Sequence, residues 1–248
     1  MKLLVDIGNT RVKWAACSDG TLGHVEIRAH GNDPRIAAAA VLDDLRDSPA
    51  EILVANVAGP EFGERVAAQL GATLGVDASF ARAQKQAGRL RNVYRDHTKL
   101  GVDRWLAMLA AVDRFSDAVC VVDAGSALTI DLVAADGEHL GGYILPGLDM
   151  MWRALTGDTG DLERFTEGDS PAGVSLAPGR DTGEAIGHGV LGAVCALIER
   201  CTGALAEDNG HVVVVTGGDA ERIIPHVAVE LVHRPQLVLE GLVLWAPR

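Results

Sequence analysis

Residues 3–10 read LLVDIGNT, and residues 12–16 continue the chain as VKWAA. The first apolar run predicts a short buried strand, and the second predicts a strand that returns beside it. Between them, the residues GNT predict a tight hairpin turn, because Gly and Asn are favoured where a hairpin reverses. Asp6 therefore stands at the tip of a buried strand, just before the turn.

The same pattern recurs in the second half of the chain. Residues 119–133 contain another apolar strand, the turn DAGSA and a returning strand. Asp123 thus corresponds to Asp6, 117 positions later (123 − 6). Simple hairpin formation does not require a strand-terminal Asp in both halves, so the repeat indicates a common function. We expect an α/β protein of two duplicated lobes, residues 1–115 and 116–248, with a cleft between them.

Composition limits the classes of protein to which the chain can belong. Of its 248 residues, 48% are hydrophobic and 23% are charged, which predicts a folded globular protein. The formal charge of −12 argues against a general nucleic-acid or anionic-membrane surface. The four cysteines form no CxxC pair, which predicts buried, reduced thiols. We find no signal peptide and no apolar run near the ~18 residues that span a bilayer, so we expect a cytoplasmic protein.

The rest of the pattern predicts alternating helices and strands. Asp33 and Pro34 predict a helix start, with Asp at the cap and Pro in the first turn. Thr98 is predicted to cap a long helix that reaches Phe115. Further helices are expected at about 182–205 and from Gln236 onward, and loops are expected at 84–97 and 157–181.

The first turn has the groups that bind a nucleotide phosphate. Gly8 lets the backbone approach a phosphate closely, and the turn N–H groups can donate to it with the Asn9 and Thr10 side chains. Asp6 only accepts hydrogen bonds, which suits Mg²⁺ or its water shell, and Lys13 can reach a phosphate. An ordinary hairpin is the alternative, but the second copy of the motif favours the functional interpretation.

Two other segments contain residue types that suit phosphoryl transfer. In GVDR, residues 101–104, Asp103 can accept a hydroxyl proton while Arg104 holds an anion. The alternative is a solvated charge pair on a helix. In TGGD, residues 216–219, two glycines follow an apolar strand and give a nucleotide room to lie against the backbone. A simple connection between a strand and a helix is the alternative there.

Three well-known motifs are absent or out of place. GHGVLG, residues 187–192, fits GxGxxG but has no preceding strand. The sequence has no GxxxxGK[ST], and its eight histidines show no HExxH or zinc-ligand spacing. A dinucleotide-binding fold, a P-loop kinase and a zinc enzyme are therefore not expected.

Five segments occur together in one order: DIGNTRVKW, LGVDRW, DAGSALTID, GGYILPG and RDTGEAIGHG. They resemble the type III pantothenate kinases of the actin, Hsp70 and sugar-kinase superfamily, from residue 6 to about residue 218. The resemblance implies an actin-like (ribonuclease H-like) fold. It also implies a homodimeric transferase that uses ATP to convert pantothenate to 4′-phosphopantothenate, the first step of coenzyme A biosynthesis.

The resemblance also assigns roles to residues. ATP is expected between the lobes with Mg²⁺, its phosphates meeting Asp6, Ile7, Gly8, Asn9, Thr10, Arg11, Val12, Lys13 and Ser126. Pantothenate is expected to be held by Tyr94, Gly101, Val102, Asp103, Arg104 and Thr182, the last near a dimer interface. Asp103 would be the general base that takes the proton of the primary hydroxyl, and Asp123 the ligand of K⁺ or NH₄⁺.

Two positions depart from the pattern of that family. Ser126 replaces the more usual Thr but keeps the hydroxyl, and His97 stands where Pro is common, which predicts a less rigid loop. Two other functions stay open: a transcriptional accessory factor of the same fold, catalytic or not, and a kinase for another small polyol or sugar. The intact carboxylates argue against a purely regulatory role, and the negative charge argues against direct DNA binding.

Overall fold

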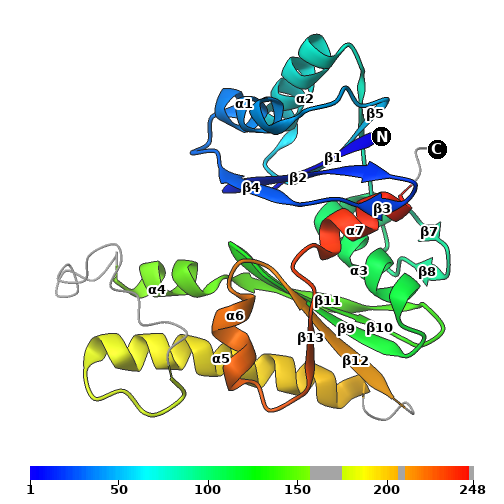
Figure 1. Ribbon diagram of the computed structural model, residues 1–248. Coiled ribbons are helices and arrows are strands. Elements are labelled where there is room, and N and C mark those ends of the chain that lie inside the picture. The colour runs from blue at the N-terminus through cyan, green and yellow to red at the C-terminus, as the bar shows by residue number, and fades with distance from the viewer. Residues whose placement is uncertain (157–174, 206–209, 246–248) are drawn as a thin grey trace. The chain divides into compact units, whose positions relative to one another are not determined.

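A computed structural model describes residues 1–156, 175–205 and 210–245. The chain forms two compact units, which we call unit 1 (residues 1–114 and the chain from Gln236) and unit 2 (residues 115–235). Figure 1 shows that each unit contains a twisted β-sheet with helices packed on it. The cleft expected between the lobes stays a prediction.

The main sheet of unit 1 has the strand order β3-β2-β1-β5-β6, and β4 also pairs with β2. Its strands are β1 (Lys2–Ile7), β2 (Arg11–Ser18), β3 (Thr21–Leu22), β4 (Glu26–Ala29), β5 (Glu51–Asn56) and β6 (Ala78–Phe80). β1 pairs antiparallel with β2 and parallel with β5. It is therefore a central strand, which explains its continuous apolar sequence.

Helices α1 (Pro34–Asp44) and α2 (Pro60–Leu74) bury their apolar faces against this sheet. Alternate residues of β1 point toward them, because side chains of a strand alternate between its two faces. Asp33 caps α1 by accepting from the Arg35 N–H at 2.9 Å, and Pro34 occupies the first turn. The predicted start of this helix is confirmed.

Two further helices of unit 1, α3 (Val102–Arg114) and α7 (Leu237–Leu244), pack on each other. A Cβ at Gly241 would clash with the main-chain carbonyl of Leu106, so the missing side chain allows close contact between the helices. The prediction that residues 116–248 form one lobe was wrong at this end. The cause is a packing contact between segments far apart in sequence, which no local pattern reveals.

The segment before α3 also differs from the prediction. It contains the short paired strands β7 (Gln86–Ala87) and β8 (Leu90–Arg91), followed by the 3₁₀ turn η1 (His97–Lys99). Asp96 caps that turn: its Oδ1 accepts from the Thr98 N–H at 3.1 Å and from the Thr98 hydroxyl at 2.6 Å. Thr98 therefore does not cap the long helix, which begins at Val102 after an extended Leu100.

Unit 2 repeats the sheet of unit 1, with the strand order β11-β10-β9-β12-β13. Its strands are β9 (Ala118–Ala124), β10 (Ala127–Val133), β11 (His139–Pro146), β12 (His211–Thr216) and β13 (Leu231–His233). Its helices are α4 (Leu148–Thr156), α5 (Thr182–Leu205) and α6 (Ala220–Ile223), which continues into the 3₁₀ turn η2 (Ile224–His226). β9 pairs antiparallel with β10 and parallel with β12, as β1 does with β2 and β5. The duplication expected from the two turns is therefore present in the sheet topology.

Helix α5 has the predicted bounds, Thr182–Leu205. Its apolar character is greater than expected from the sequence, in which no apolar run near the length of a membrane span was found. In the described part of the chain, it is the one helix long and apolar enough to cross a membrane by those two criteria. Leu191, Val194 and Ile198 lie in the apolar cluster that also contains the strands of unit 2. This position is typical of the core helix of a globular unit.

All four cysteines are buried and free of disulfide bonds. Burial raises the pKa of the Cys120 thiol to about 12 and that of Cys195 to about 11. Both thiols stay protonated at neutral pH and act as small apolar groups. The prediction of buried, reduced thiols is confirmed.

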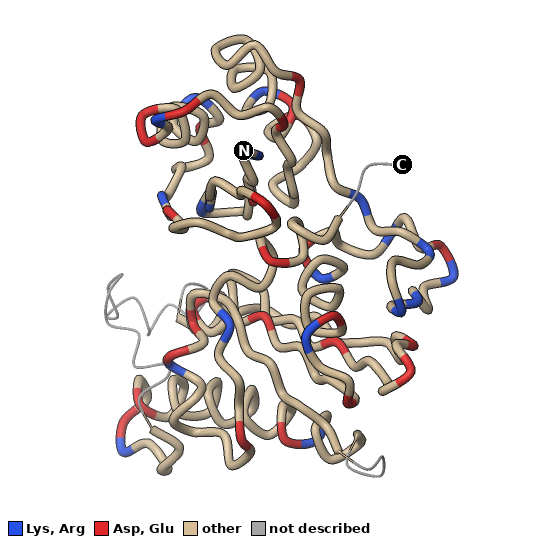
Figure 2. The backbone as a smooth tube through the Cα atoms, turned by 45° about the vertical axis from the view of Figure 1, so that its right-hand side comes forward, with Lys and Arg blue, Asp and Glu red and all other residues tan. Residues whose placement is uncertain are grey.

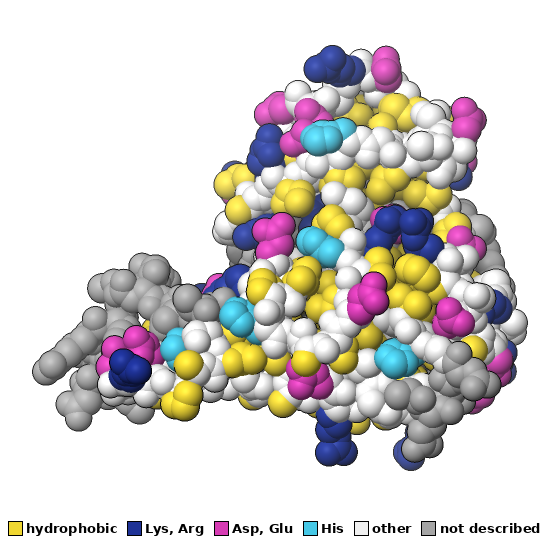
Figure 3. Space-filling view, turned by 60° about the horizontal axis from the view of Figure 1, so that its bottom comes forward, with side chains coloured by type: hydrophobic (Ala, Val, Ile, Leu, Met, Phe, Trp, Pro, Cys, Tyr) yellow, Lys and Arg dark blue, Asp and Glu magenta, His cyan; other side chains and the backbone are white. Residues whose placement is uncertain are grey.

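Charged residues of both signs lie along both units, but not evenly. In Figure 2, basic positions gather around β7 and β8, because residues 82–95 contain five Arg or Lys and no Asp or Glu. On the face seen in Figure 3, basic side chains are separated by acidic, polar and apolar ones.

Candidate functional site

The first turn, residues 8–10, is closed by a hydrogen bond from the Gly8 N–H to the Arg11 carbonyl at 3.0 Å. A Cβ at Gly8 would lie 3.2 Å from that oxygen, so a side chain would crowd the turn. Asp6 is buried one residue before the end of β1 and pairs across the hairpin with Lys13. The carboxylate and the ammonium groups are therefore fixed to neighbouring strands of one sheet.

Five of the residues predicted to bind ATP in this hairpin differ clearly in exposure. Asn9, Thr10 and Arg11 are exposed. Ile7 and Val12 are fully buried in the core of unit 1. The last two can contribute only main-chain groups, while their side chains hold the hairpin on the sheet.

His30 supports this turn and was not predicted from the sequence. His30 follows β4 and is fully buried. Its Nε2 lies 3.0 Å from the Gly8 carbonyl oxygen, and its main-chain N–H donates to the Thr10 carbonyl at 3.2 Å. No local signal marked this residue as a support, because the two turn carbonyls that it contacts lie 20 or more positions earlier in the chain.

The second turn, Gly125 and Ser126, joins β9 to β10. The Gly125 N–H donates to the Ala127 carbonyl at 3.1 Å, and the Gly147 N–H donates to the Ser126 carbonyl at 3.0 Å. Ser126 is exposed. Asp123 lies one residue before the end of β9, as Asp6 does in β1, and pairs with Thr129 and Thr216 on the neighbouring strands.

The turn TGGD follows β12, which pairs with β9 on the edge opposite β10, and it contacts the end of β9. The Asp219 N–H donates to the Ala124 carbonyl at 2.8 Å. Gly217 has a φ of 95°, and a Cβ there would clash with the main chain of Ala124. Arg222 then links Asp219 to Asp149 of α4, with 2.9 Å from Nη1 to each carboxylate. Unit 2 thus brings Asp123, Ser126 and both glycines of the turn into one region.

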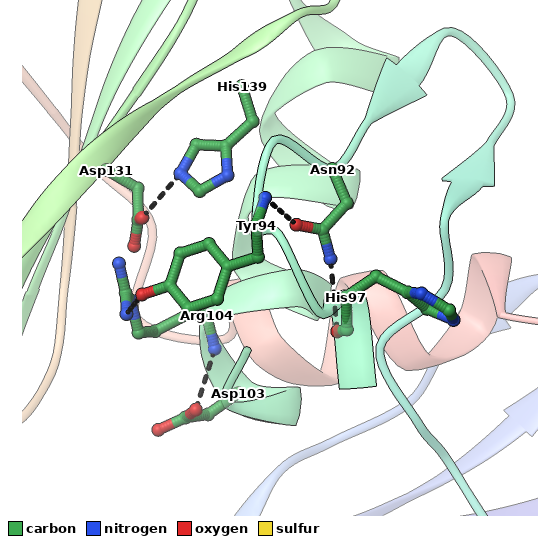
Figure 4. A network of polar contacts seen from close by, with 7 residues as sticks. All are labelled: Asn92, Tyr94, His97, Asp103, Arg104, Asp131 and His139. Atoms are coloured by element: carbon green, nitrogen blue, oxygen red, sulfur yellow. Dashed lines mark hydrogen bonds and ion pairs between the residues drawn. The ribbon is translucent and has the colours of Figure 1, made fainter. Parts of the chain in front are cut away.

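The GVDR segment lies at the start of α3, and Figure 4 shows its contacts. The Asp103 Oδ1 accepts from the Arg104 N–H at 2.8 Å, and a Cβ at Gly101 would come within 2.6 Å of this oxygen. Gly101 thereby leaves room for the carboxylate. Arg104 is buried, and its Nη1 donates to the Tyr94 hydroxyl at 2.7 Å. Tyr94 and Arg104, predicted to bind the same substrate, are therefore in direct contact.

The loop that presents Tyr94 is held by Asn92. The Asn92 Oδ1 accepts from the Tyr94 N–H at 3.0 Å, and its Nδ2 lies 3.3 Å from the His97 carbonyl (Figure 4). On the other side of His97, Thr98 donates to Asp96 from its hydroxyl and its N–H, and these two hydrogen bonds lower the pKa of Asp96. The chain around His97 is therefore held by hydrogen bonds from Asn92 and to Asp96, although His97 replaces the usual proline.

Unit 2 also contains a buried hydrogen-bonded pair of side chains that the sequence did not reveal. His139 and Asp131 lie on the paired strands β11 and β10, and His139 Nε2 is 2.9 Å from Asp131 Oδ1 (Figure 4). Both side chains are almost fully buried. Their pairing depends on a register shift between Leu132 and Val133, which a sequence pattern cannot locate.

The remaining predicted residue, Thr182, is the exposed first residue of α5 in unit 2, whereas Tyr94 and the GVDR segment belong to unit 1. In the described part of the chain, no three His, Cys, Asp or Glu residues form a group able to hold a metal ion. Mg²⁺ does not need such a group, because it binds through one or two carboxylates, water and substrate phosphates. The Mg²⁺ expected with ATP and the K⁺ or NH₄⁺ expected at Asp123 therefore stay predictions.

A model of the type III pantothenate kinase family matches residues 2–204 of the chain. The chain belongs to that family. A type III pantothenate kinase from Alcanivorax borkumensis is 38% identical over 98% of this chain and 97% of its own length. One from Halorhodospira halophila is 36% identical over 99% and 98%. The resemblance found in the five motifs is therefore confirmed, and so is the assignment to kinases.

Solved structures show the fold. A conserved protein of Campylobacter jejuni, assigned to a Baf family of transcriptional activators, has a TM-score of 0.61 at 22% identity and covers 96% of this chain and 94% of its own. The activator of a 2-hydroxyisocaproyl-CoA dehydratase from Clostridium difficile, solved with bound ADPNP, has a TM-score of 0.52 at 10% identity over 98% and 92%. The predicted fold class is confirmed.

Proposed function

We propose that this chain transfers the γ-phosphoryl group of ATP to the primary hydroxyl of pantothenate, giving 4′-phosphopantothenate for coenzyme A biosynthesis. The observation that carries the proposal is membership of the type III pantothenate kinase family, with matches over nearly the full length of the relatives. The contact between Tyr94 and Arg104 beside Asp103 supports it from the structure.

The phosphates of ATP are proposed to meet both strand-end turns. In unit 1, the N–H groups and side chains of the exposed turn residues donate to phosphate oxygens, and Lys13 adds a positive charge. In unit 2, the Ser126 hydroxyl donates. Asp6 and Asp123 provide carboxylates for Mg²⁺ and for K⁺ or NH₄⁺, and these cations neutralise phosphate charge when bound.

Pantothenate is proposed to bind at the start of α3. Arg104 and Tyr94 hold its carboxylate and hydroxyl groups, and the Gly101 and Val102 main chain lines the same place, with Thr182 as a further contact. Asp103 accepts the proton of the primary hydroxyl as that oxygen attacks the γ-phosphorus. Phosphoryl transfer through a loose transition state depends more on positioning than on base strength, so an ordinary carboxylate is adequate.

A homodimer is also proposed, through the apolar surface of unit 2. The edge strand β11 exposes Leu140, Tyr143 and Ile144, and α4 exposes Met150 and Leu155. Exposed apolar side chains on an edge strand favour association with a second surface. Light scattering coupled to size exclusion tests this proposal: a monomer at micromolar concentration would contradict it. A cytoplasmic location is proposed from the four free thiols, which fit a reducing compartment.

The activity is tested by incubating the protein with ATP, Mg²⁺ and pantothenate, with and without K⁺, and following ADP. We expect ADP to form only with pantothenate present, and faster with K⁺. ADP formed with a sugar in place of pantothenate would contradict the substrate assignment. Absence of ADP with every acceptor would contradict catalysis and leave a regulatory role.

A further inference from the structure

His30 has hydrogen bonds at both ring nitrogens although it is fully buried. Its Nδ1 accepts from the Asn32 N–H at 3.1 Å, so this nitrogen carries a lone pair and no proton. The proton of a neutral imidazole is then on Nε2, which donates to the Gly8 carbonyl at 3.0 Å. The ring also packs against Phe62, with centroids 4.7 Å apart. One tautomer of His30 therefore satisfies both contacts.

The contact with Gly8 determines where the next N–H group points. The described chain has no cis peptide bond, and in a trans peptide the C=O and the following N–H lie on opposite sides. Because the Gly8 carbonyl is bound to His30, the Asn9 N–H of the same peptide points away from His30. If this peptide turned over, the carbonyl oxygen would take the place of the N–H. An oxygen there would repel a phosphate, whereas the N–H donates to it.

We propose that His30, as the neutral Nε2–H tautomer, is a positioning residue that holds the Gly8–Asn9 peptide in the orientation that binds nucleotide phosphate. It acts through the Gly8 carbonyl and touches no substrate. This inference rests on the proposed ATP site at residues 6–13.

Two variants separate this role from a general loss of packing. In His30→Gln, the side-chain amide nitrogen replaces Nε2 and can still donate to the Gly8 carbonyl, while the contact with Asn32 is lost. In His30→Asn, the shorter amide replaces Nδ1 and can accept from the Asn32 N–H, while the contact with Gly8 is lost. Both variants remove the ring beside Phe62, so both lose similar packing. The dissociation constant of a non-hydrolysable ATP analogue with Mg²⁺ is measured by calorimetry for each.

We expect His30→Asn to raise this constant about tenfold and His30→Gln to raise it by less than about threefold, the range for one hydrogen bond. The KM for pantothenate should stay unchanged in both variants. His24→Gln is the matched control, because His24 is exposed and contacts only the Glu26 carboxylate in the described structure, and it should bind the analogue like the wild type. Equal effects of the two His30 variants, or an equal rise in the KM for pantothenate, would overturn the proposal.

A measurement on the wild-type protein tests the tautomer of His30 even if a variant does not fold. Nitrogen NMR of histidine-labelled protein should show His30 as the Nε2–H tautomer, both free and with the analogue bound. The other tautomer or an imidazolium would overturn the proposal. Failure of the wild type to bind the analogue would overturn the ATP site and this inference together. Analogue binding without pantothenate-dependent ADP would contradict the reaction alone, and the His30 variants would still decide the inference.

Discussion

The two strand-end turns share a main-chain hydrogen bond from the residue that follows a later strand of each sheet, but that residue differs. After β4 in unit 1, His30 donates its N–H to the Thr10 carbonyl; after β11 in unit 2, Gly147 donates its N–H to the Ser126 carbonyl. The two residues therefore occupy corresponding places, one with an imidazole and the other without a side chain. The first turn has three residues between its strands and the second has two.

The difference shows two ways to hold a turn in place. In unit 1, the longer turn leaves space for the His30 ring, which binds the Gly8 carbonyl. In unit 2, the start of α4 packs directly on the shorter turn, and a Cβ at Gly147 would lie 2.7 Å from the Ser126 carbonyl oxygen and would also clash with that of Gly125. Both units keep the main-chain hydrogen bond to the turn, from His30 to Thr10 and from Gly147 to Ser126. The turn of unit 1 is also held by the His30 side chain, and that of unit 2 by direct backbone contact.

The largest effect on stability is expected from Gly147→Ala. The added methyl group meets main-chain atoms that cannot move without disturbing the turn, so we expect a loss of about 2–3 kcal/mol in the free energy of unfolding. Denaturation in urea measures it. Gly189→Ala is the control: this exposed position in α5 has nothing within 4 Å of a new Cβ, and Ala should stabilise the helix by about 0.5–1 kcal/mol. Equal stability of Gly147→Ala and the wild type would contradict the comparison.

The sequence predicted these turns well because their signals are local. An apolar strand, a carboxylate at its tip and small turn residues stand within about ten positions of one another, and the cap of α1 is just as local. His30 and Gly147 were not predicted as supports, because each depends on a contact with a distant strand end. The same reason explains the misplaced α7, which is held by α3. Thr98 was misjudged because Asp96, two residues earlier, binds its hydroxyl.

The loops after β5 and β12 are also held by different groups in the two units. In unit 1, the Asn56 amide holds its loop, donating to the Gly59 carbonyl at 2.8 Å and accepting from the Ala58 N–H at 3.1 Å. In unit 2, the charged group of Arg222 holds the TGGD turn. Asn56→Ala should cost about 1 kcal/mol of stability at any ionic strength, because it removes neutral hydrogen bonds.

Arg222→Gln is expected to have a smaller and salt-dependent effect. Its side chain is 29% exposed and that of Asp149 is 53% exposed, so water screens the pair. We expect a loss of about 0.5 kcal/mol at low salt, which nearly disappears near 1 M salt. Arg153→Gln, also on α4 but bound only to a main-chain carbonyl in the described structure, is the control. A loss that does not change with salt would show that the ionic contacts are not the cause.

The smallest effect is expected from Asp33→Asn at the cap of α1. Hydrogen bonds from the Arg35 side chain and N–H lower the pKa of Asp33 from 3.8 to about 2. Because the folded pKa is the lower one, this carboxylate stabilises the fold above the unfolded pKa and loses its effect as pH falls toward 2. The wild type should be slightly more stable than the variant at pH 7, and the difference should vanish between pH 3.8 and about 2. A constant difference over this range would contradict the assignment.

Catalysis by Asp103 is the central claim, and one rate measurement tests it directly. With saturating ATP, Mg²⁺ and pantothenate, Asp103→Asn should form 4′-phosphopantothenate more slowly by a factor on the order of 10²–10⁴, the range for a lost general base. Binding of the ATP analogue should stay unchanged, and Asp113→Asn, at an exposed position of the same helix, should react like the wild type. An Asp103→Asn variant that forms product at the wild-type rate would contradict the account.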